Sequence, residues 1–417
     1  MQSGIVLFLG ALRHGEFESL LSRKIPCGAL IDTNTKLHLP DLKEFEVVER
    51  FDFLRPDDDL FAKLSEIKAK WGLRCVINVV EHYVAIFARL APKLQVPAIS
   101  LHSARLCLDK SAMRRRFLER IGPTATGQFE EVRTEQQLRD FAARVGFPLI
   151  LKPTNLSASL FISLNHSLDE LLASYQRLVS EVPSYYRQAA LKDKELAIQV
   201  EEFMEGSNHS IDCWVDAGGN VTATPVVDVV TGADVGIEDF HHFARIVPSS
   251  LSAEQQAVAS ELAMAGARAL DMTTVIAHVE FIQTKAGPKL LEIGARPGGN
   301  RIRILEMTYG VDQIFAYYQI LCGQSPQVVP LKEQPSAIVT PFPRRHGTLR
   351  AFAGLDRLQQ LPTYCYHEVR GQVGQTVGLA KEGFKAPLYV ELTAPSRDQV
   401  SRDVDRIALW GDLMEVN

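Results

Sequence analysis

Residues 290–300, LLEIGARPGGN, place a carboxylate and a guanidinium four residues apart at the end of an apolar run. Glu292 follows two leucines, and Arg296 precedes the turn sequence Pro297-Gly298-Gly299. Opposite charges inside an apolar run form either a structural ion pair or a reactive centre. Gly298 and Gly299 would let the backbone approach a ligand closely, which makes both of them candidate substrate contacts.

These residues end the second strand of a predicted β-hairpin. Residues 276–283 (IAHVEFIQ) and 289–296 (KLLEIGAR) flank the turn sequence KAGP at 285–288. If the turn centres on its second residue, Glu280 lies opposite Glu292 on one face, with the two Cβ atoms about 4.5–5.5 Å apart. Opposed carboxylates repel each other unless a cation lies between them, and Mg²⁺ favours carboxylates combined with phosphate oxygens and water. The hairpin therefore predicts a magnesium site.

A turn displaced by one residue would give a different result. One glutamate would then face solvent and pair with Lys285 or Lys289. Arg296 bears on the choice, because a guanidinium just before a glycine-rich turn can hold a phosphate that the metal also binds. Arg296 could equally bridge to Glu280 or Glu292, so the spacing alone leaves both interpretations open.

The first hundred residues predict a small open α/β sheet. An apolar run at 5–9, stopped by Gly10, is followed by a helical pattern from about 16 to 21. Further strands are expected at 29–31 and 75–80, and helices at 60–71 and 83–94. Gly10 by itself does not distinguish a phosphate-binding loop from an ordinary strand-to-helix turn.

A second unit begins near Asp109. The sequence DKSAMRRRFLERIG predicts a helix that stops at Gly122-Pro123. Alternating strands and helices followed by hairpins predict two facing subdomains with a cleft between them. Strands are expected at 147–153, 196–204 and 210–216, a helix at 167–180, and a serine-capped helix at 252–270. Turn glycines at 347, 354, 371 and 374 indicate a last, small α+β unit.

Composition limits the classes of function. With 417 residues, 46% hydrophobic and 23% charged, the chain is typical of a soluble globular protein with several domains. The 50 acidic and 45 basic residues argue against a nucleic-acid partner. The apolar run at 4–12 has no basic leader, so neither a signal peptide nor a membrane span is expected. Cysteines 27, 75, 107, 213, 322 and 365 form no Cys-x-x-Cys pair, which favours a reducing, cytoplasmic location without zinc or a disulfide framework.

Four motifs in order resemble the ATP-grasp superfamily and, within it, the L-amino acid ligases. They are DKSAMRR at 109, FPLILKP at 147, VEEFMEGSNHSID at 200 and HVEFIQTKAGPKLLEIGARPGG at 278. The resemblance implies a mixed α/β and α+β chain with an ATP-grasp fold. It would comprise an N-terminal Rossmann-like (pre-ATP-grasp) domain at 1–104, an ATP-grasp domain with a nucleotide cleft at 105–328, and a C-terminal α+β domain at 329–417.

The resemblance also implies roles for particular residues, with ATP and Mg²⁺, or Mn²⁺, as cofactors. Glu280 and Glu292 would bind the metal, and Arg296 would act with Lys152 in catalysis. Glu81 falls where related ligases place an acidic residue near the amino acid. The nucleotide would contact Lys110 and Lys152 through its phosphates, Ser157 and Ser159 in the covering loop, Glu201, Glu202, Phe203 and Met204 near adenine, and Asn208 or His209 at the ribose.

Three departures from the family pattern concern the lid, the metal and the substrate. The loop at 154–159, TNLSAS, contains no glycine, although such loops are usually glycine-rich. Gly294 stands where many relatives have asparagine, so water or substrate would complete the metal shell. The sequence FHHFARIVPSS places His242 and Arg245 where some relatives have a glutamate and a histidine. A substrate with an additional carboxylate, paired with Arg245, is therefore expected.

The implied reaction joins a carboxylic acid to the amine of an amino acid through an acyl phosphate, and releases ADP and phosphate. Its partners would be these small molecules, and a homodimer would be usual. One alternative is a carboxylase that activates bicarbonate, although Pro-Gly-Gly-Asn occupies the place of the glutamate that such enzymes carry after the arginine. Another is a nucleotide-binding regulator without catalysis, which the glycine-free lid and Gly294 would favour.

Overall fold

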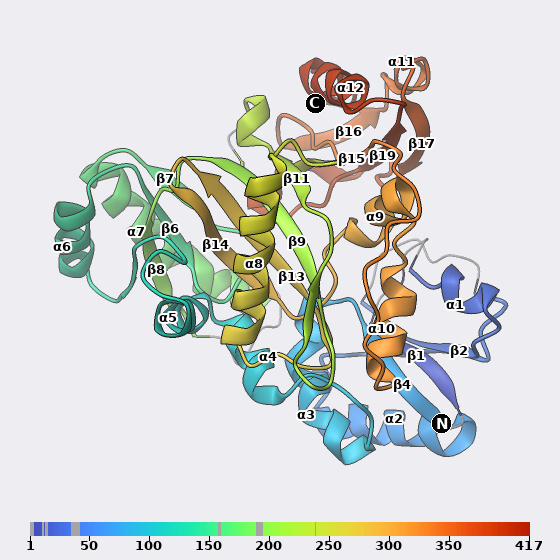
Figure 1. The fold of residues 1–417 in the computed structure, drawn as a ribbon. Coiled ribbons are helices and arrows are strands. Elements are labelled where there is room, and N and C mark those ends of the chain that lie inside the picture. The colour runs from blue at the N-terminus through green and yellow to red at the C-terminus, as the bar shows by residue number, and fades with distance from the viewer. Residues whose placement is uncertain are drawn as a thin grey trace.

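The structure is a computed structural model that describes residues 4–10, 12, 16–34, 42–156, 160–188, 195–237 and 239–417. A long antiparallel sheet lies at its centre (Figure 1). An N-terminal α/β unit, a small sheet with two helices, and a C-terminal unit surround this sheet. The mixed α/β and α+β class expected from the sequence is confirmed.

The N-terminal unit is a parallel sheet with strand order β3-β2-β1-β4. Its strand β1 is a continuous apolar run because both faces of this strand are buried. Val6 and Phe8 pack toward the central sheet, whereas Ile5, Leu7 and Leu9 pack against the unit's own helices. The elements are β1 (Ile5–Gly10), α1 (Glu18–Ser22), β2 (Cys27–Asp32), β3 (Val47–Phe51), α2 (Asp57–Trp71), β4 (Leu73–Asn78), η1 (Glu81–Tyr83) and α3 (Val84–Leu94).

Two helices, α4 (Leu101–Leu108) and α5 (Lys110–Arg120), lead into the small subdomain. The side chain of Asp109 caps α5 by accepting hydrogen bonds from the backbone N–H groups of residues 111 and 112. The subdomain's antiparallel sheet has the order β5-β8-β6-β7. Its elements are β5 (Phe129–Val132), α6 (Glu135–Val145), β6 (Leu149–Pro153), β7 (Ser163–Asn165), α7 (Leu168–Gln188) and β8 (Ile198–Glu202), so α7 extends beyond the helix expected at 167–180.

The central sheet runs in the order β14-β13-β9-β11-β12-β15-β19-β17, with β10 paired to β9. Its central elements are β9 (Ser207–Val215), β10 (Val221–Ala223), β11 (Val227–Thr231), η2 (Ala233–Val235), β12 (His242–Val247), α8 (Ala253–Ala269), β13 (Val275–Thr284), β14 (Gly287–Gly294), α9 (Arg301–Tyr309) and α10 (Gln313–Leu321). Ala277, Val279 and Phe281 of β13 pack on α8. The alternate residues His278 and Glu280 consequently face away from α8, because successive side chains in a strand point to opposite faces.

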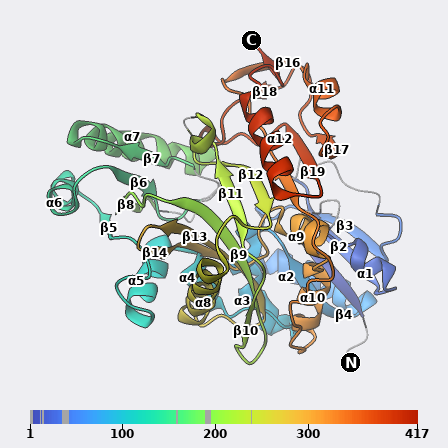
Figure 2. The same cartoon turned by 45° about the horizontal axis from the view of Figure 1, so that its top comes forward.

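The C-terminal unit adds β15, β19 and β17 to the central sheet, so this sheet crosses the domain boundary expected at residue 328. The division into three domains stays a prediction. Figure 2 shows α11, β16 and β18 at the top of the C-terminal unit, whereas α12 packs on β15 and β12 of the central sheet. The elements are β15 (Ser336–Val339), β16 (Gly347–Ala351), α11 (Leu355–Gln359), β17 (Tyr364–Val369), β18 (Thr376–Val377), η3 (Ala380–Glu382), β19 (Leu388–Thr393), α12 (Arg397–Leu409) and β20 (Glu415–Val416).

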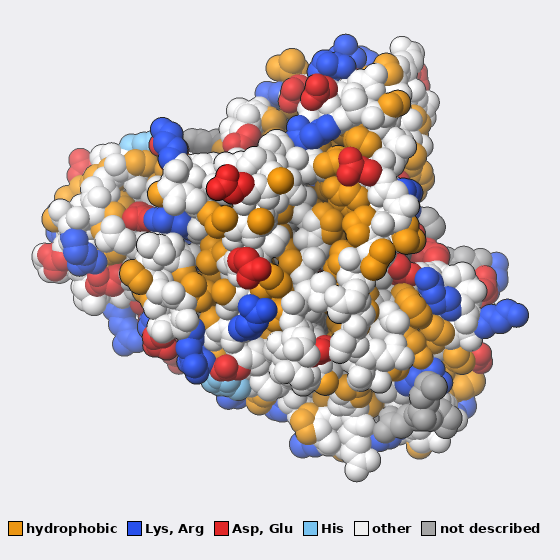
Figure 3. Space-filling view, in the orientation of Figure 1, with side chains coloured by type: hydrophobic (Ala, Val, Ile, Leu, Met, Phe, Trp, Pro, Cys, Tyr) orange, Lys and Arg blue, Asp and Glu red, His pale blue; other side chains and the backbone are white. Residues whose placement is uncertain are grey.

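The face in Figure 3 mixes acidic and basic side chains around a band of hydrophobic ones. Neither sign of charge dominates that face. Among the described helices, none combines the length and the apolar character that crossing a membrane requires.

Candidate active site

The hairpin of β13 and β14 brings Glu280 opposite Glu292, as expected. The symmetrical turn behind that expectation is wrong, because the strands are joined by the two residues Lys285-Ala286. A β-bulge at Leu291 adds one residue to β14 and shifts the register by one. The two-residue turn and the bulge shift the register in opposite directions. Glu280 therefore still lies opposite Glu292.

Positive groups lie beside each of these carboxylates. Glu280 Oε1 accepts a hydrogen bond from His278 Nε2 at 3.0 Å, and His242 Nε2 lies 3.7 Å away. Burial raises the pKa of Glu280, but His242, His278 and Arg301 outweigh burial and hold it well below its usual range. Glu292 pairs with Lys110 Nζ at 3.2 Å.

Two facing carboxylates supply the hard oxygen ligands that Mg²⁺ prefers, so this pair fits the ion. No third His, Cys, Asp or Glu joins them in a ready-made metal cluster within the described part of the chain. Phosphate oxygens and water would have to complete a metal shell here.

Asp212 and His278 form a hydrogen-bonded chain behind Glu280. His278 Nδ1 lies 2.6 Å from Asp212 Oδ1, and the Gly298 N–H donates to Asp212 Oδ2 at 3.0 Å. A side chain at Gly298 would meet the His278 ring at 2.3 Å, so only glycine allows this approach. Sequence reasoning missed Asp212 and His278, although His278 stands two residues before Glu280 and therefore on the same face.

Arg301, which sequence reasoning also missed, lies near the hairpin and is only 1% exposed. Its Nε donates to Ser210 Oγ at 3.0 Å and its Nη1 to the Gly299 carbonyl at 2.9 Å. Its Nη2 lies 3.4 Å from His242 Nδ1. Burial lowers the pKa of Arg301, while Glu280 and Asp212 oppose this effect. Nothing in the sequence distinguishes it from other arginines at a helix start.

His242 and Arg245 both lie near this group. Burial lowers the pKa of His242 well below its usual range, and Arg301 and Arg245 add to this effect against Glu280. Arg245 is 9% exposed and donates from Nη1 to Thr340 Oγ1 at 2.7 Å. His242 thus faces the hairpin, whereas Arg245 is nearly buried beside it.

Arg296 contacts the N-terminal unit. Its Nε lies 2.8 Å from Glu81 Oε2, and its Nη1 donates to the Pro297 carbonyl at 2.9 Å. A Cβ at Gly294 would lie 2.9 Å from the same Glu81 oxygen. Glu81, Gly294 and Arg296 are therefore brought together at the hairpin.

Lys152 belongs to a buried ion cluster in the small subdomain. Its Nζ lies 2.7 Å from Glu201 Oε1, and Arg114 Nη1 lies 2.6 Å from Glu201 Oε2. Burial lowers the pKa of Lys152, with Glu201 opposing. Burial raises the pKa of Glu201, but Arg114 and Lys152 reverse this and lower it. Lys110, in contrast, bridges the hairpin and the covering loop, because it also donates to the Leu156 carbonyl at 2.7 Å.

Comparison with known proteins identifies the superfamily. Residues 145–303 match the ATP-grasp domain model, which spans the lysine cluster and the hairpin. The chain therefore contains a segment that matches an ATP-grasp domain. This domain generally binds ATP with Mg²⁺. Over 375 residues, the chain is 23% identical to an uncharacterised protein, y4rH, of Sinorhizobium fredii, covering 88% of this chain and 74% of that one.

The relatives include ligases. The alanine–anticapsin ligase of Bacillus subtilis is 23% identical over 279 residues, which cover 64% of this chain and 58% of the ligase. The crystal structure of an L-amino acid ligase from Bacillus licheniformis superposes with a TM-score of 0.83 at 16% identity, over 100% of this chain and 99% of that one. The expected resemblance to ATP-grasp ligases is confirmed, while this chain matches little more than half the length of the anticapsin ligase.

The segment expected to hold adenine links β8 of the small sheet to β9 of the central sheet. Glu202 pairs with Lys289 Nζ at 2.8 Å, and a Cβ at Gly127 would meet Glu202 and Met204 at about 3 Å. The backbone N–H of Phe203 donates to the Pro148 carbonyl at 3.3 Å. The side chain of Glu201 turns into the Lys152 cluster, which leaves its backbone for the expected adenine contact.

His209 does not face a ribose site in this structure. It is 2% exposed, with Nδ1 2.9 Å from Asp228 Oδ1 and Nε2 2.6 Å from Ser207 Oγ. Both ring nitrogens are therefore engaged, which leaves half-buried Asn208 as the candidate ribose contact. Ser157 and Ser159, expected in the phosphate-covering loop, lie outside the described residues.

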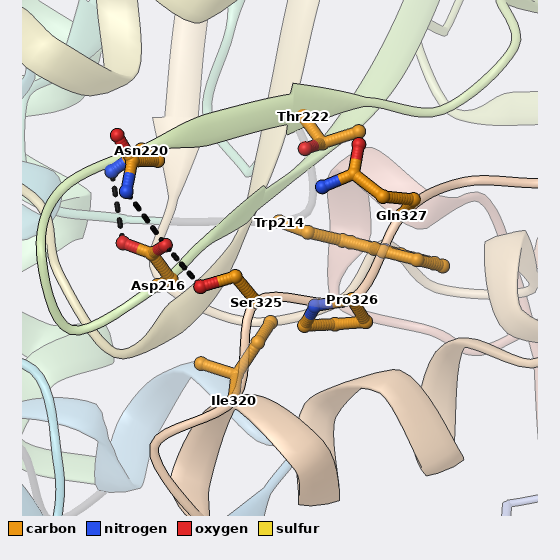
Figure 4. Close-up of a pocket in the computed structure, with 8 residues that line it drawn as sticks. All are labelled: Trp214, Asp216, Asn220, Thr222, Ile320, Ser325, Pro326 and Gln327. Carbon is orange, nitrogen blue, oxygen red and sulfur yellow. Dashed lines mark hydrogen bonds between the residues drawn. The ribbon is translucent and has the colours of Figure 1, made fainter.

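A cavity of about 140 Å³ lies near the turn between β9 and β10, away from the glutamates (Figure 4). Asp216 at its edge accepts hydrogen bonds from Ser325 Oγ at 2.6 Å and Asn220 Nδ2 at 2.8 Å. These bonds lower the pKa of Asp216 to about 2. Because the protein itself satisfies this carboxylate, the cavity does not extend the candidate site. The cavity is lined by Trp214, Asp216, Asn220, Thr222, Ile320, Ser325, Pro326 and Gln327.

Proposed function

We propose that this ATP-grasp protein is a carboxylate–amine ligase that joins a carboxylic acid, such as an amino acid, to the amine of an amino acid. A carboxylate oxygen attacks the γ-phosphorus of ATP, and ADP leaves. The amine then attacks the acyl carbon of the mixed anhydride, phosphate leaves, and the nitrogen loses a proton. The observation that carries the proposal is the facing pair Glu280 and Glu292 with Lys110 and Arg296 at its edges.

The chain's own residues would bind and neutralise the transferring phosphoryl group. Glu280 and Glu292 would hold Mg²⁺, which supplies Lewis-acid stabilisation of phosphate charge when bound. Lys110 is already 3.2 Å from Glu292 and would reach a phosphate on the same metal. Lys152 would have to leave Glu201, or share it, in order to reach the nucleotide. Arg296 would exchange Glu81 for the acyl phosphate.

The substrates proposed are a carboxylic acid with a second acidic group and an amino acid. His242 is the half-buried member of a group in which Arg301 and Arg245 supply positive charge. A second carboxylate beside His242 would be attracted by both guanidinium groups. Glu81 would receive the ammonium group of an amino acid when Arg296, now 2.8 Å away, leaves it.

The test is a panel of amino acids and dicarboxylates, offered singly and in pairs with ATP and Mg²⁺. ADP and phosphate release would be followed, with mass spectrometry on each positive reaction. A product mass equal to acid plus amine minus water supports the ligase and identifies its substrates. AMP as the nucleotide product would contradict the acyl-phosphate route.

Two further arms separate the alternatives. Bicarbonate-dependent ADP release with a carboxylated product would assign the chain to the carboxylases instead. Nucleotide binding without turnover across the whole panel would favour a regulator. Glu292→Gln provides the matched control, because it keeps the shape of the side chain but removes one carboxylate charge from the proposed metal pair.

A further inference from the structure

Two cysteines meet where the N-terminal unit packs on the central domain. Cys75 lies in β4 and is fully buried, whereas Cys322 follows the last turn of α10 and is exposed. Helix α10 packs directly on β4. The two thiols are hydrogen bonded to each other, with Cys75 donating to the sulfur of Cys322.

A second donor and a cation complete the surroundings of Cys322. The hydroxyl of Tyr318, one turn earlier in α10, also donates to the Cys322 sulfur. Arg74 Nη1 in turn donates to the Tyr318 hydroxyl at 2.6 Å. Cys322 therefore receives two hydrogen bonds and lies within the field of a guanidinium group.

These contacts favour a thiolate on Cys322. The hydrogen bond from Cys75 lowers the pKa of Cys322 to about 6, with Tyr318 and Arg74 adding to this effect against partial burial. The end of α10 opposes the anion, because carbonyl groups point toward it. The pKa of Cys75 is raised well above its usual range, mainly by its bond to Cys322 and by burial. Cys27 on the neighbouring strand β2 is buried, which raises its pKa to about 12.

We propose that Cys322 and Cys75 form a peroxide-reactive dithiol that closes into a disulfide between α10 and β4. The exposed member can meet an oxidant, and the buried member already contacts it and can resolve the product. This pairing of an accessible thiol with a resolving thiol is what redox-sensing cysteines require. The inference is independent of the ligase proposal.

The chemistry balances with a hydroperoxide as the oxidant. The Cys322 thiolate attacks one peroxide oxygen, the O–O bond breaks, and hydroxide leaves, which gives a sulfenic acid on Cys322. The Cys75 thiol then attacks the Cys322 sulfur, the S–O bond breaks, and the oxygen leaves as water after taking up the thiol proton. The two sulfurs together lose two electrons, and the peroxide is reduced to water.

The disulfide would join elements that continue toward the candidate active site. Strand β4 ends at Asn78, three residues before Glu81. Helix α10 follows α9, which begins at Arg301 just after the Arg296 loop. Oxidation would thus fasten the segment that carries Glu81 to the segment that follows Arg296.

The first measurement is peptide mapping of the whole chain. Reduced protein would be treated with hydrogen peroxide, blocked with N-ethylmaleimide, digested and analysed by mass spectrometry. The expected product is a Cys75–Cys322 peptide pair, lost in Cys322→Ser and retained in Cys365→Ser, which removes the other exposed cysteine. In Cys75→Ser, dimedone should trap the sulfenic acid on Cys322.

The second measurement is the alkylation rate of Cys322 by iodoacetamide at pH 6, compared with a model cysteine peptide. The larger thiolate fraction, offset by lower intrinsic nucleophilicity, predicts a rate about tenfold above the model thiol. Peroxide treatment that leaves both cysteines reduced would overturn the proposal. Oxidation that pairs Cys322 with another cysteine in preference to Cys75 would overturn it as well.

Discussion

The carboxylate of Glu81 occupies the space that a side chain at position 294 would fill. Its Oε2 lies 2.9 Å from the Cβ position of Gly294 and 2.8 Å from Arg296 Nε. Many relatives have an asparagine at the position of Gly294. In this chain the carboxylate of Glu81, from the N-terminal unit, reaches the space that such a side chain would occupy. A glycine at 294 and an acid at 81 are therefore coupled.

This coupling predicts compensation between two substitutions. Gly294→Asn alone should weaken binding of Mn²⁺-ATP, because the new side chain collides with Glu81 and displaces the Arg296 pair. Glu81→Ala alone removes the partner of Arg296 and should also weaken binding. In the double variant the asparagine gains room, so nucleotide affinity measured by calorimetry should exceed that of Gly294→Asn. Simple additivity of the two losses would refute the coupling.

The hydrogen bonds that join Asp212 to His278 and His278 to Glu280 predict that Asp212 fixes the orientation of the Glu280 carboxylate. Asp212→Asn would leave His278 without its buried acceptor, so Glu280 would lose its fixed orientation. Metal affinity should fall about 10–100-fold, as is usual when a group supporting a ligand is removed. Titration with Mn²⁺ measures this fall. Asp216→Asn on the same side of the sheet should leave metal affinity unchanged, and an equal loss there would point to a general structural effect.

Removing Glu201 from the buried ion cluster should lower the stability of the fold strongly. Glu201→Ala would leave Arg114 and Lys152, which are 0% and 3% exposed, without their shared carboxylate. The free energy of unfolding should drop by about 3–5 kcal/mol. Urea denaturation gives the value. Lys152→Met should cost less, since Glu201 keeps Arg114, and the reverse order of the two effects would contradict this account.

The ion pair between Asp228 and Arg397 of α12 predicts that acid lowers the stability of the folded protein. It lies 2.6 Å from Arg397 Nη2 and 2.9 Å from His209 Nδ1. Burial raises its pKa, but the bonds from His209 and Ser249 outweigh burial and bring it to about 2. Because the folded pKa lies below the unfolded value of about 3.9, the stabilisation of about 2–3 kcal/mol is complete above that value.

That stabilisation should disappear as pH falls from about 4 toward 2. The measurement is the unfolding free energy of the wild type and Asp228→Asn across this range. The two curves should converge at the acid end and separate by pH 5. Parallel curves would show that Asp228 is not the group responsible.

Much of the architecture could be predicted from local patterns. The continuous apolar run at β1 predicts a strand buried on both faces, and Ser252 with Gln255 caps α8 as expected from the sequence. Alternation along β13 separates His278 and Glu280 from the residues under α8. These features depend on residues that are close in sequence, because the periods of a strand and a helix fix the direction in which each side chain points.

The sequence by itself predicted the resemblance to ATP-grasp ligases and the facing glutamates. Only the tertiary structure decided which groups surround them. Arg301, Asp212 and Glu81 come from a helix start, a neighbouring strand and another unit, and no local period relates them to the hairpin. Likewise, His209 was given a ribose contact from motif position, whereas packing turned its side chain toward buried partners. Contacts between distant segments follow from the packing of whole elements, which the spacing of residues in one segment does not specify.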